Sequence, residues 1–554
     1  MYNDGFVNNV YPNLISSRAL KTAKQRTLMA ISLFMLMFSA PIIRLTQIMI
    51  MNCPTERHRV SELLSPPIIS RADIVDRNRH IIATSLPTVS LYACPHEIID
   101  VPEAITKICN VFKEIDPEQL QKKLSATKTF VWIKRHLSPR QEQAVLNQGI
   151  PGLHFLKTEK RVYPDKNLLS HVLGGTDIDN IGIAGIEKVF DEGLRSSEAP
   201  LTLSINMKVQ HAVRDELQNS MNEFGAIGGA AIVMKVSTGE IMAMASIPDF
   251  DPNKNSDPRD KSRFNLTTSS AIEPGSSAKI FNTAMALETG RITPFTRFDA
   301  RNPLQIGRFT VHDFKPKSSF LSVEEILKFS SNIGSAKIAL DVGASAQKKF
   351  FQQIGALDPI YCELPDVQHP LYPRNWSNAS AATISFGHGI ALAPLHLLTI
   401  FAGIVNGGTM TYPTLLKRTS PYSEKKIISS KTSKQIRALL RIAVVSGTNK
   451  QADVPGYQVG GKSGTAEKQS GGRYLKHSNY CAFMGAFPIM SPEYAIYVIL
   501  DDPKASKKTY GYATAGWNAN PTAARIIKRI GPLLGVMIPS ITENLDLRAV
   551  LEER

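Results

Sequence analysis

The pattern of apolar and polar residues divides this sequence into segments with different expected structures. Thr27 to Ile43 is an uncharged apolar run, which predicts a helix at the short end of the lengths that cross a bilayer. From Arg44 to about Asp215, short apolar groups predict mixed helices and strands. Beyond this point, longer β-rich and helix-forming runs predict a second, larger domain. The expected parts are therefore residues 1–26, 27–43, 44–215 and 216–554.

Within the two folded parts, the same pattern locates individual elements. Short helices are expected at residues 107–112 and 118–124. A last helix is expected to begin at Asn520-Pro521, with asparagine as its cap. Strands are expected at Val89–Ala93, at Gly229–Lys235 and Ile241–Ser246, which form a hairpin, and at Asn479–Gly485 and Glu493–Asp501.

The charges around the apolar run favour a membrane anchor with a cytoplasmic N-terminus. Only Asp4 opposes the basic residues that precede the run, which are Arg18, Lys21, Lys24 and Arg26. A cleaved signal peptide is one alternative, but its apolar region is usually shorter, and Pro41 makes a poor cleavage site. A buried helix of a soluble domain is the other, and the basic flank argues against it. We therefore expect an uncleaved single-pass anchor and an exported remainder.

Composition narrows the partners of the exported part. The chain carries a formal net charge of +16, spread along its length, and contains no zinc-finger, basic-zipper or RNA-binding signature. A basic surface near an anionic membrane or cell wall is the simpler interpretation, so no nucleic-acid partner is expected. The 5 cysteines are odd in number, widely spaced and without a C-x-x-C pair, which argues against a disulfide framework or a structural metal.

The first candidate for catalytic chemistry is Ser276. Pro274-Gly275 interrupts the preceding structure, and an apolar helix-forming run extends from Ile280 to Leu287. Ser276 is therefore expected in the first turn of a helix, with Lys279 on the same face. A hydroxyl beside an amine is a possible nucleophile and base. This S-x-x-K pattern alone is a weak signal, because it occurs four times in the chain.

Two further motifs raise the specificity of this signal. Ser330-Ser331-Asn332 is the only S-x-N triplet after Ser276, and Lys462-Ser463-Gly464 is the only K-[ST]-G in the chain. Taken alone, the first could be a helix cap or a turn. Glycine inside a strand-like run, as at Gly464, usually marks the close approach of a ligand or another backbone. In this order, the three motifs are those of penicillin-binding proteins and class A β-lactamases.

The chain resembles the class B penicillin-binding proteins, which are single-pass D,D-transpeptidases of peptidoglycan synthesis, from about Arg44 to about Gly535. Within that family it looks most like the division-specific, septal members of the penicillin-binding protein 3 type. Further matching motifs are Arg71-x-x-Ile-x-Asp-Arg, Pro248–Asn253, Ser385–Ile390, Asn406-Gly407-Gly408 and Gly447-Thr448. The chain departs from the family where Ala72 and Arg79 replace glycines, which puts the local turn in question. Ser463 replaces a more common threonine, a change that the pattern allows.

The resemblance implies an α+β multidomain fold. Its parts are an N-terminal transmembrane helix, an elongated pedestal or dimerisation-type domain, and a transpeptidase domain. The last is expected to be an antiparallel five-stranded sheet flanked by helices.

The same resemblance implies a role for each candidate residue and requires no metal or cofactor. Ser276 would attack the carbonyl between the two terminal D-alanines of a peptide stem, and Lys279 would be the base. Ser330 would pass the proton to the leaving D-alanine, while Asn332 would hold Lys279 and the substrate amide. The terminal carboxylate would bind to the strand that carries Lys462, Ser463, Gly464 and Thr465. The backbone N–H groups of Ser276 and Thr465 would form the oxyanion hole.

The partners implied by the resemblance are stem peptides ending in D-Ala-D-Ala, β-lactams, a membrane glycan polymerase and other division proteins. The catalytic domain is expected in the periplasm, anchored in the bacterial inner membrane. No glycosyltransferase domain precedes the anchor, so glycan polymerisation is not expected. The alternatives are an elongation-specific transpeptidase, a D,D-carboxypeptidase, a serine β-lactamase and a catalytically silent scaffold. The anchor and the large extra region argue against the lactamase, and the intact motifs argue against the scaffold.

Overall fold

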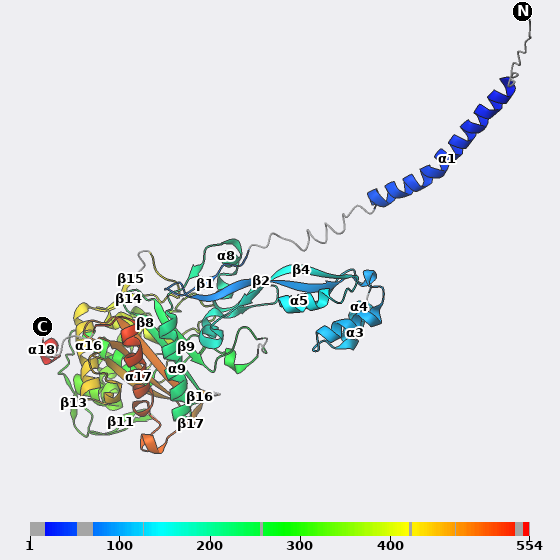
Figure 1. The fold of residues 1–554 in the computed structure, drawn as a ribbon. Helices are drawn as coiled ribbons and strands as arrows, with labels where there is room; N and C mark the ends of the chain where they lie inside the picture. Colours follow the sequence, from blue (N-terminus) through cyan, green and yellow to red (C-terminus); the bar gives the residue numbers. More distant parts are fainter. Residues whose placement is uncertain are drawn as a thin grey trace, which may run out of the picture. The chain divides into compact units, whose positions relative to one another are not determined.

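The structure is a computed structural model with two compact units, Met1–Ile68 and Ile69–Arg554 (Figure 1). It describes residues 17–51, 70–125, 127–254, 257, 259–307, 309–419, 424–470, 473–537 and 547–552. In the first unit, helix α1, Ser17–Met51, contains the predicted anchor. Its segment Lys21–Thr46 is 26 residues long with a mean hydropathy of 2.0 and is long enough to cross a membrane. The helix extends beyond the apolar run because good helix formers flank it.

The pedestal forms the N-terminal part of the second unit and is built on a five-stranded sheet. The strand order is β3-β2-β1-β7, and β4 also pairs with β2. The long strand β2 runs antiparallel to both β3 and β4, and its second half is the predicted strand Val89–Ala93. The strands are β1 Ile74–Val75, β2 Ile81–Ala93, β3 Val131–Leu137, β4 Leu153–Val162 and β7 Leu201–Thr202.

Three short helices pack against one end of this sheet, and we call this end the pedestal head. Their apolar faces form one cluster with Leu91 and Ala93 of β2. A side-chain cap precedes each helix and proline occupies its first turn, a combination that starts helices efficiently; the caps are Asp100, Asp116 and Ser138. Both predicted helices are confirmed, although the first begins earlier because Asp100 caps it. The helices are α3 Val101–Val111, α4 Pro117–Leu124 and α5 Pro139–Leu146.

The other end of the pedestal contains a buried cluster of charges. Arg71 Nε and Arg161 Nε each donate to a different carboxylate oxygen of Glu187, both at 2.7 Å. Arg71 Nη1 also donates to Asp191 Oδ1 at 2.6 Å. At most 1% of the Arg71, Arg161 and Glu187 side chains is exposed. The elements around the cluster and the head are η1 Pro95–Glu97, η2 Lys166–Leu169, α6 Ser170–Leu173, β5 Gly175–Thr176, β6 Gly182–Ala184, α7 Gly185–Val189 and α8 Asp191–Ser196.

The turn between β1 and β2 forms without the glycine usual in the family. Arg79 has a φ of 70°, in the left-handed region that favours glycine. The Asp76 carboxylate accepts hydrogen bonds from the backbone N–H groups of Asn78 and His80 at 2.7 and 2.9 Å. These bonds hold the turn closed in spite of the side chain at position 79.

The C-terminal part of the second unit, expected from the resemblance to be the transpeptidase domain, is organised around an antiparallel five-stranded sheet in the order β16-β17-β18-β8-β9. The structure confirms all four strands predicted for this domain, because each predicted range lies within an observed strand or overlaps it. The helix predicted to begin at Asn520-Pro521 is α17, Ala519–Leu533, and the side chain of Asn518 caps it, so the predicted cap at Asn520 is wrong by two residues. It was also predicted to be the last helix, but α18, Leu547–Glu552, follows it. The strands are β8 Gly228–Lys235, β9 Ile241–Ile247, β16 Gly460–Ser470, β17 Arg473–Phe487 and β18 Tyr494–Asp501.

Both faces of this sheet are covered by helices. In β8, Ala231 and Val233 pack with helices α9 and α17, while Ile232 and Met234 pack in the opposite core with α10 and α15. Because successive strand residues point to opposite faces, burial of both faces requires the continuous apolar run seen in the sequence. Figure 1 shows α9 and α17 next to each other near β8. The covering helices are α9 Met207–Phe224, α10 Lys279–Glu288, α15 Pro394–Val405 and α16 Ser430–Val445.

The remaining elements surround this core. The helices are α11 Val323–Phe329, α12 Asn332–Val342, α13 Ala344–Gln353, α14 Asn378–Ile384 and α18 Leu547–Glu552. The short strands are β10 Arg297–Asp299, β11 Leu304–Ile306, β12 Phe309–Val311, β13 Phe320–Ser322, β14 Thr409–Thr411 and β15 Glu424–Lys426. The single turns are η3 Lys261–Arg263, η4 Gly275–Ala278, η5 Lys450–Ala452, η6 Lys507–Thr509 and η7 Ala515–Trp517.

The loop between β9 and Ser276 docks onto the pedestal. Asn253 Nδ2 donates to the carbonyl oxygen of Tyr163 at 2.8 Å, and the backbone N–H of Tyr163 donates to Asn253 Oδ1 at 2.9 Å. His171 Nε2 lies 2.7 Å from the carbonyl oxygen of Ser262. The pedestal therefore holds the segment that leads into the Ser276 turn.

Candidate active site

Glycine at two positions lets the K-S-G strand lie directly against the turn that carries Ser276. Gly275, with a φ of 51°, begins η4, which continues into α10, so Ser276 lies in the predicted first turn. A Cβ atom at Gly275 would lie 2.7 Å from the carbonyl oxygen of Thr465, and one at Gly464 would lie 2.4 Å from that of Pro274. The sequence reading of Gly464 as a point of close approach is confirmed, and the approaching group is the backbone before Ser276.

The side chain of Lys279 lies fully buried beneath Ser276. Its Nζ is 2.8 Å from Ser276 Oγ, 2.6 Å from Asn332 Oδ1 and 3.1 Å from the carbonyl oxygen of Ser330. Ser330 Oγ is also within reach at 3.3 Å. Burial lowers the pKa of Lys279 well below its usual range, the positive charge of Lys462 lowers this pKa further, and Asp313 opposes the change.

The S-x-N triplet lies at the junction of α11 and α12. Ser330 ends α11 in the left-handed region at a φ of 62°, a conformation that costs a non-glycine residue about 1 kcal/mol or more. Ser331 caps α12 by accepting from the N–H of Gly334 at 3.0 Å. Asn332 Nδ2 donates to the carbonyl oxygen of His312 at 3.0 Å, which turns Oδ1 toward Lys279. The triplet is therefore both a helix cap and part of the cluster around the amine.

The K-S-G strand, β16, is one of the two edge strands of the sheet. Lys462 is only 1% exposed, and burial lowers its pKa to about 7. Its Nζ donates to the carbonyl oxygen of Ser463 at 3.1 Å, so it acts on Lys279 through its charge. Thr465 Oγ1 accepts from the N–H of Ala515 at 3.1 Å, which leaves its hydroxyl hydrogen able to donate. The structure thus brings the three predicted motifs to one place.

The sequence of the chain matches two known families over most of its length. Residues 229–528 match the penicillin-binding protein transpeptidase domain, and residues 68–212 match the penicillin-binding protein dimerisation domain. The chain belongs to the penicillin-binding protein transpeptidase family. This membership confirms the predicted family, its multidomain fold and its enzyme class, a serine-type peptidoglycan D,D-transpeptidase.

Individual relatives of this penicillin-binding protein agree with that assignment. The chain is 35% identical over 483 residues to the probable peptidoglycan D,D-transpeptidase FtsI of Caulobacter vibrioides, with 84% of this chain and 82% of the relative covered. It is 28% identical to the peptidoglycan D,D-transpeptidase FtsI of Escherichia coli K12, with 80% and 81% covered. Its fold is similar to that of penicillin-binding protein 3 from Mycobacterium tuberculosis in complex with ampicillin, with a TM-score of 0.69, 23% identity, and 85% and 97% covered.

The site is supported by three residues that the sequence did not predict. The Asp313 carboxylate accepts from the N–H groups of Asn332 and Ile333 at 2.5 and 3.0 Å. Asn449 Oδ1 accepts from the N–H of Ser463 at 3.1 Å. Both residues lie in loops without a periodic pattern, so no sequence signal distinguished them.

The third residue that the sequence did not predict, Glu273, forms hydrogen bonds with several segments at the edge of the site. Its carboxylate accepts from the N–H of Gly389 and from Gln469 Nε2, each at 2.8 Å, and from the hydroxyl of Tyr474 at 3.2 Å. Burial raises the pKa of Glu273. The contact with Gly389 explains why the Ser385–Ile390 motif belongs near Ser276 although it lies far away in the sequence.

Proposed function

We propose that this peptidoglycan D,D-transpeptidase cross-links stem peptides at the division septum through an acyl-enzyme on Ser276. The observation that carries the catalytic part is the environment of Lys279, a fully buried amine 2.8 Å from the Ser276 hydroxyl. The septal part is supported by the 35% identity to a relative named FtsI.

Burial and the positive charge of Lys462 lower the pKa of Lys279 and so favour its neutral form, and the hydrogen bonds around the amine are compatible with that form. Asn332 Oδ1 and the carbonyl oxygen of Ser330 can only accept hydrogen bonds, at 2.6 and 3.1 Å. A neutral amine has two N–H donors, which match these two acceptors, and its lone pair remains for the Ser276 hydroxyl. An ammonium has no lone pair and cannot accept that proton. Lys279 is therefore the base that activates Ser276.

Acylation begins with attack of Ser276 Oγ on the carbonyl carbon between the two terminal D-alanines. The Ser276 proton moves to Lys279 Nζ and then, through Ser330 Oγ, to the nitrogen of the leaving D-alanine as its C–N bond breaks. The oxyanion is held by the backbone N–H groups of Ser276 and Thr465, which lie together because of Gly275 and Gly464. The result is an ester between Ser276 and the shortened stem.

The terminal carboxylate of the stem binds beside β16. Lys462 supplies the positive charge, and the hydroxyls of Ser463 and Thr465 donate hydrogen bonds. An amine of a second stem then attacks the ester, forms the cross-link and releases Ser276. A β-lactam, which carries a carboxylate beside a strained amide, acylates Ser276 by the same route. Its ring-opened fragment remains attached and blocks the acceptor amine.

The rate of acylation is expected to follow a bell-shaped pH profile. At low substrate concentration the rate should fall toward acid as Lys279 becomes protonated, because an ammonium cannot accept the Ser276 proton. It should also fall as the pH rises through about 7, where Lys462 loses its charge. A bound carboxylate raises the pKa of Lys462, so saturating substrate moves the alkaline limb to higher pH.

Second-order rate constants for a labelled penicillin across the pH range measure both limbs. If Lys462→Arg, which keeps the charge, retains the same alkaline limb in its remaining activity, the assignment of Lys462 is wrong.

Asp313→Asn is expected to move the acid limb of this profile to lower pH. The Asp313 carboxylate raises the pKa of Lys279, so its neutralisation lowers that pKa further. Loss of the charge at the start of α12 should also destabilise the protein by about 1 kcal/mol. The control is Asp341→Asn, the same change at an exposed position in α12, which should leave the limb in place. If the acid limb of Asp313→Asn stays where it is in the wild type, Asp313 does not raise the pKa of Lys279.

The apolar helix α1 and the family support the proposed location and partners. We place the N-terminus in the cytoplasm and the catalytic domain in the periplasm, because basic residues precede the apolar segment of α1. The helix is also the surface through which a membrane-embedded glycan polymerase and other division proteins would reach this chain.

Depletion of the protein in its own bacterium is expected to produce filaments, because cells continue to elongate when septal cross-linking stops. In undepleted cells, fluorescence microscopy should show a tagged copy of the protein at midcell. Wild-type protein expressed from a plasmid should restore division to depleted cells. Rounded cells after depletion would instead assign the protein to elongation and refute the septal part of the proposal. A Ser276→Ala chain that restores division would indicate a scaffold.

A further inference from the structure

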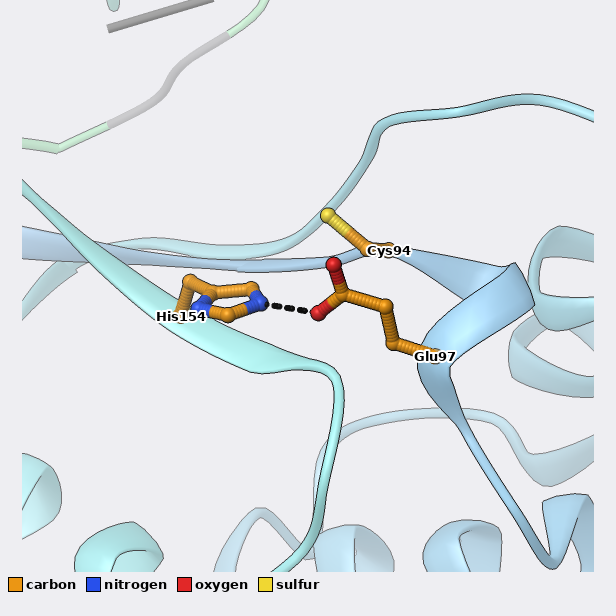
Figure 2. A group of neighbouring side chains, drawn as sticks. All are labelled: Cys94, Glu97 and His154. Atoms are coloured by element: carbon orange, nitrogen blue, oxygen red, sulfur yellow. Dashed lines mark hydrogen bonds and ion pairs between the residues drawn. The ribbon is translucent and has the colours of Figure 1, made fainter. Parts of the chain in front are cut away.

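The tertiary structure brings a thiol, a carboxylate and an imidazole together in the pedestal head. Cys94 directly follows β2, Glu97 ends η1, and His154 lies near the start of β4 (Figure 2). One ligand atom from each residue lies within 4.8 Å of the other two, and His154 Nε2 is 2.7 Å from Glu97 Oε2. All three side chains are half-buried. None of them belongs to the catalytic cluster, which is built entirely from the transpeptidase domain.

The backbone beneath these side chains is fixed by hydrogen bonds. The N–H of Cys94 donates to the carbonyl oxygen of Gly152 at 2.8 Å, and the N–H of Glu97 donates to that of Cys94 at 2.9 Å. Gly152, at a φ of 81°, allows this approach, because a Cβ atom there would lie 3.0 Å from Glu97. The three side chains thus project from a preformed scaffold, as Figure 2 shows.

The set of donor atoms matches the preference of borderline divalent metals. Thiolate sulfur, imidazole nitrogen and carboxylate oxygen are the ligands of Zn²⁺, at about 2.0–2.3 Å each, whereas Mg²⁺ and Ca²⁺ prefer oxygen alone. Tetrahedral ligands at these lengths lie about 3.5 Å apart. The ligand atoms now lie within 4.8 Å of one another, so binding would require the Cys94 and Glu97 side chains to rotate and the 2.7 Å contact between His154 and Glu97 to open.

We infer that Cys94, Glu97 and His154 form a binding site for a Zn²⁺-class divalent ion. Binding replaces the hydrogen bond between His154 and Glu97, and the thiol releases its proton to become a thiolate ligand. The ion then joins the end of β2, η1 and the start of β4, which are the segments from which the chain enters α3. Its role is structural, and it holds the pedestal head together. The sequence argued against a structural metal because the three ligands do not follow any zinc spacing.

Titration of the full-length protein in detergent with Co²⁺, as a spectroscopic substitute for Zn²⁺, tests this site. We expect one equivalent to bind with a thiolate-to-cobalt charge-transfer band, and Zn²⁺ but not Mg²⁺ to displace it. Cys94→Ser should abolish the band, and His154→Ala should weaken binding at least about tenfold, the loss caused elsewhere by removal of mere outer-shell partners. Cys109→Ser, which changes another half-buried thiol of the head, should leave the band unchanged. His80 pairs with Asp165 at 2.9 Å, and this pair includes no thiol. His80→Ala should therefore also leave the charge-transfer band unchanged.

Hydrogen exchange distinguishes a structural site from surface binding. Zn²⁺ should slow exchange in β2, η1 and β4 of the wild type but not of Cys94→Ser. Labelled penicillin should acylate Cys94→Ser at the wild-type rate. Failure of the metal-site proposal can therefore be distinguished from failure of the catalytic proposal. The inference is overturned if no charge-transfer band forms, if the band persists in Cys94→Ser, or if protection appears equally in both proteins.

Discussion

Ser276→Ala is expected to reduce acylation by labelled penicillin, and transpeptidation with it, by more than about 10⁴-fold. The size follows from losses measured when the nucleophile of other acyl-transfer enzymes is removed. The physical reason is that, among the described residues, no other hydroxyl lies as close to Lys279 Nζ as that of Ser276. Ser330 Oγ is 3.3 Å from Nζ, against 2.8 Å for Ser276 Oγ, and Ser330 lies outside the η4 turn against which Thr465 packs. Gel fluorescence and the mass of the intact protein after incubation measure the loss.

The neighbouring serine provides the control for this experiment. Ser277 is fully buried, and its Oγ has no hydrogen-bond partner among the described residues, so Ser277→Ala should acylate at close to the wild-type rate. Thermal unfolding of both variants should resemble that of the wild type, because each loses only one hydroxyl. Covalent labelling of Ser276→Ala at an undiminished rate would show that another residue is the nucleophile.

Glu187→Ala is expected to destabilise the pedestal by about 3–5 kcal/mol, the cost of removing one partner from a buried ion pair. The carboxylate of Glu187 is 0% exposed and bonds to both Arg71 and Arg161, each at 2.7 Å. Its loss leaves two guanidinium groups buried, with Asp191 as the remaining carboxylate for the Arg71 side chain among the described residues. Because multidomain proteins do not unfold in one step, the measurement is native-state hydrogen exchange of the strands around the cluster.

Two further substitutions test this explanation. Glu118→Ala, at an exposed position of α4, should change the free energy of opening by no more than about 0.5 kcal/mol. Glu187→Gln should be less damaging than Glu187→Ala, since an amide oxygen still accepts from one arginine. Equal exchange rates in Glu187→Ala and the wild type would mean that the charge cluster contributes little to pedestal stability.

Much of the fold could be predicted from the sequence because local chemistry encodes it. The two-sided burial of the central sheet requires uninterrupted apolar strands, and Gly229–Lys235 and Glu493–Asp501 were located on that pattern alone. The break at Pro274-Gly275 predicted the start of the helix that carries Ser276. Boundaries were less accurate where a cap decides them, as at Asp100 and Asn518, since several polar residues in one stretch could serve as the cap.

The sequence by itself determined the family and the three motifs, because these depend on residue type and order. Only the tertiary structure decided that the amine of Lys279 is dehydrated and surrounded by two acceptor-only oxygens and two hydroxyls. Burial and the field of Lys462 arise from packing between segments that are far apart in the chain, and no local pattern records them. The same holds for Asp313, Glu273 and the Cys94 cluster, whose partners meet only when the chain folds.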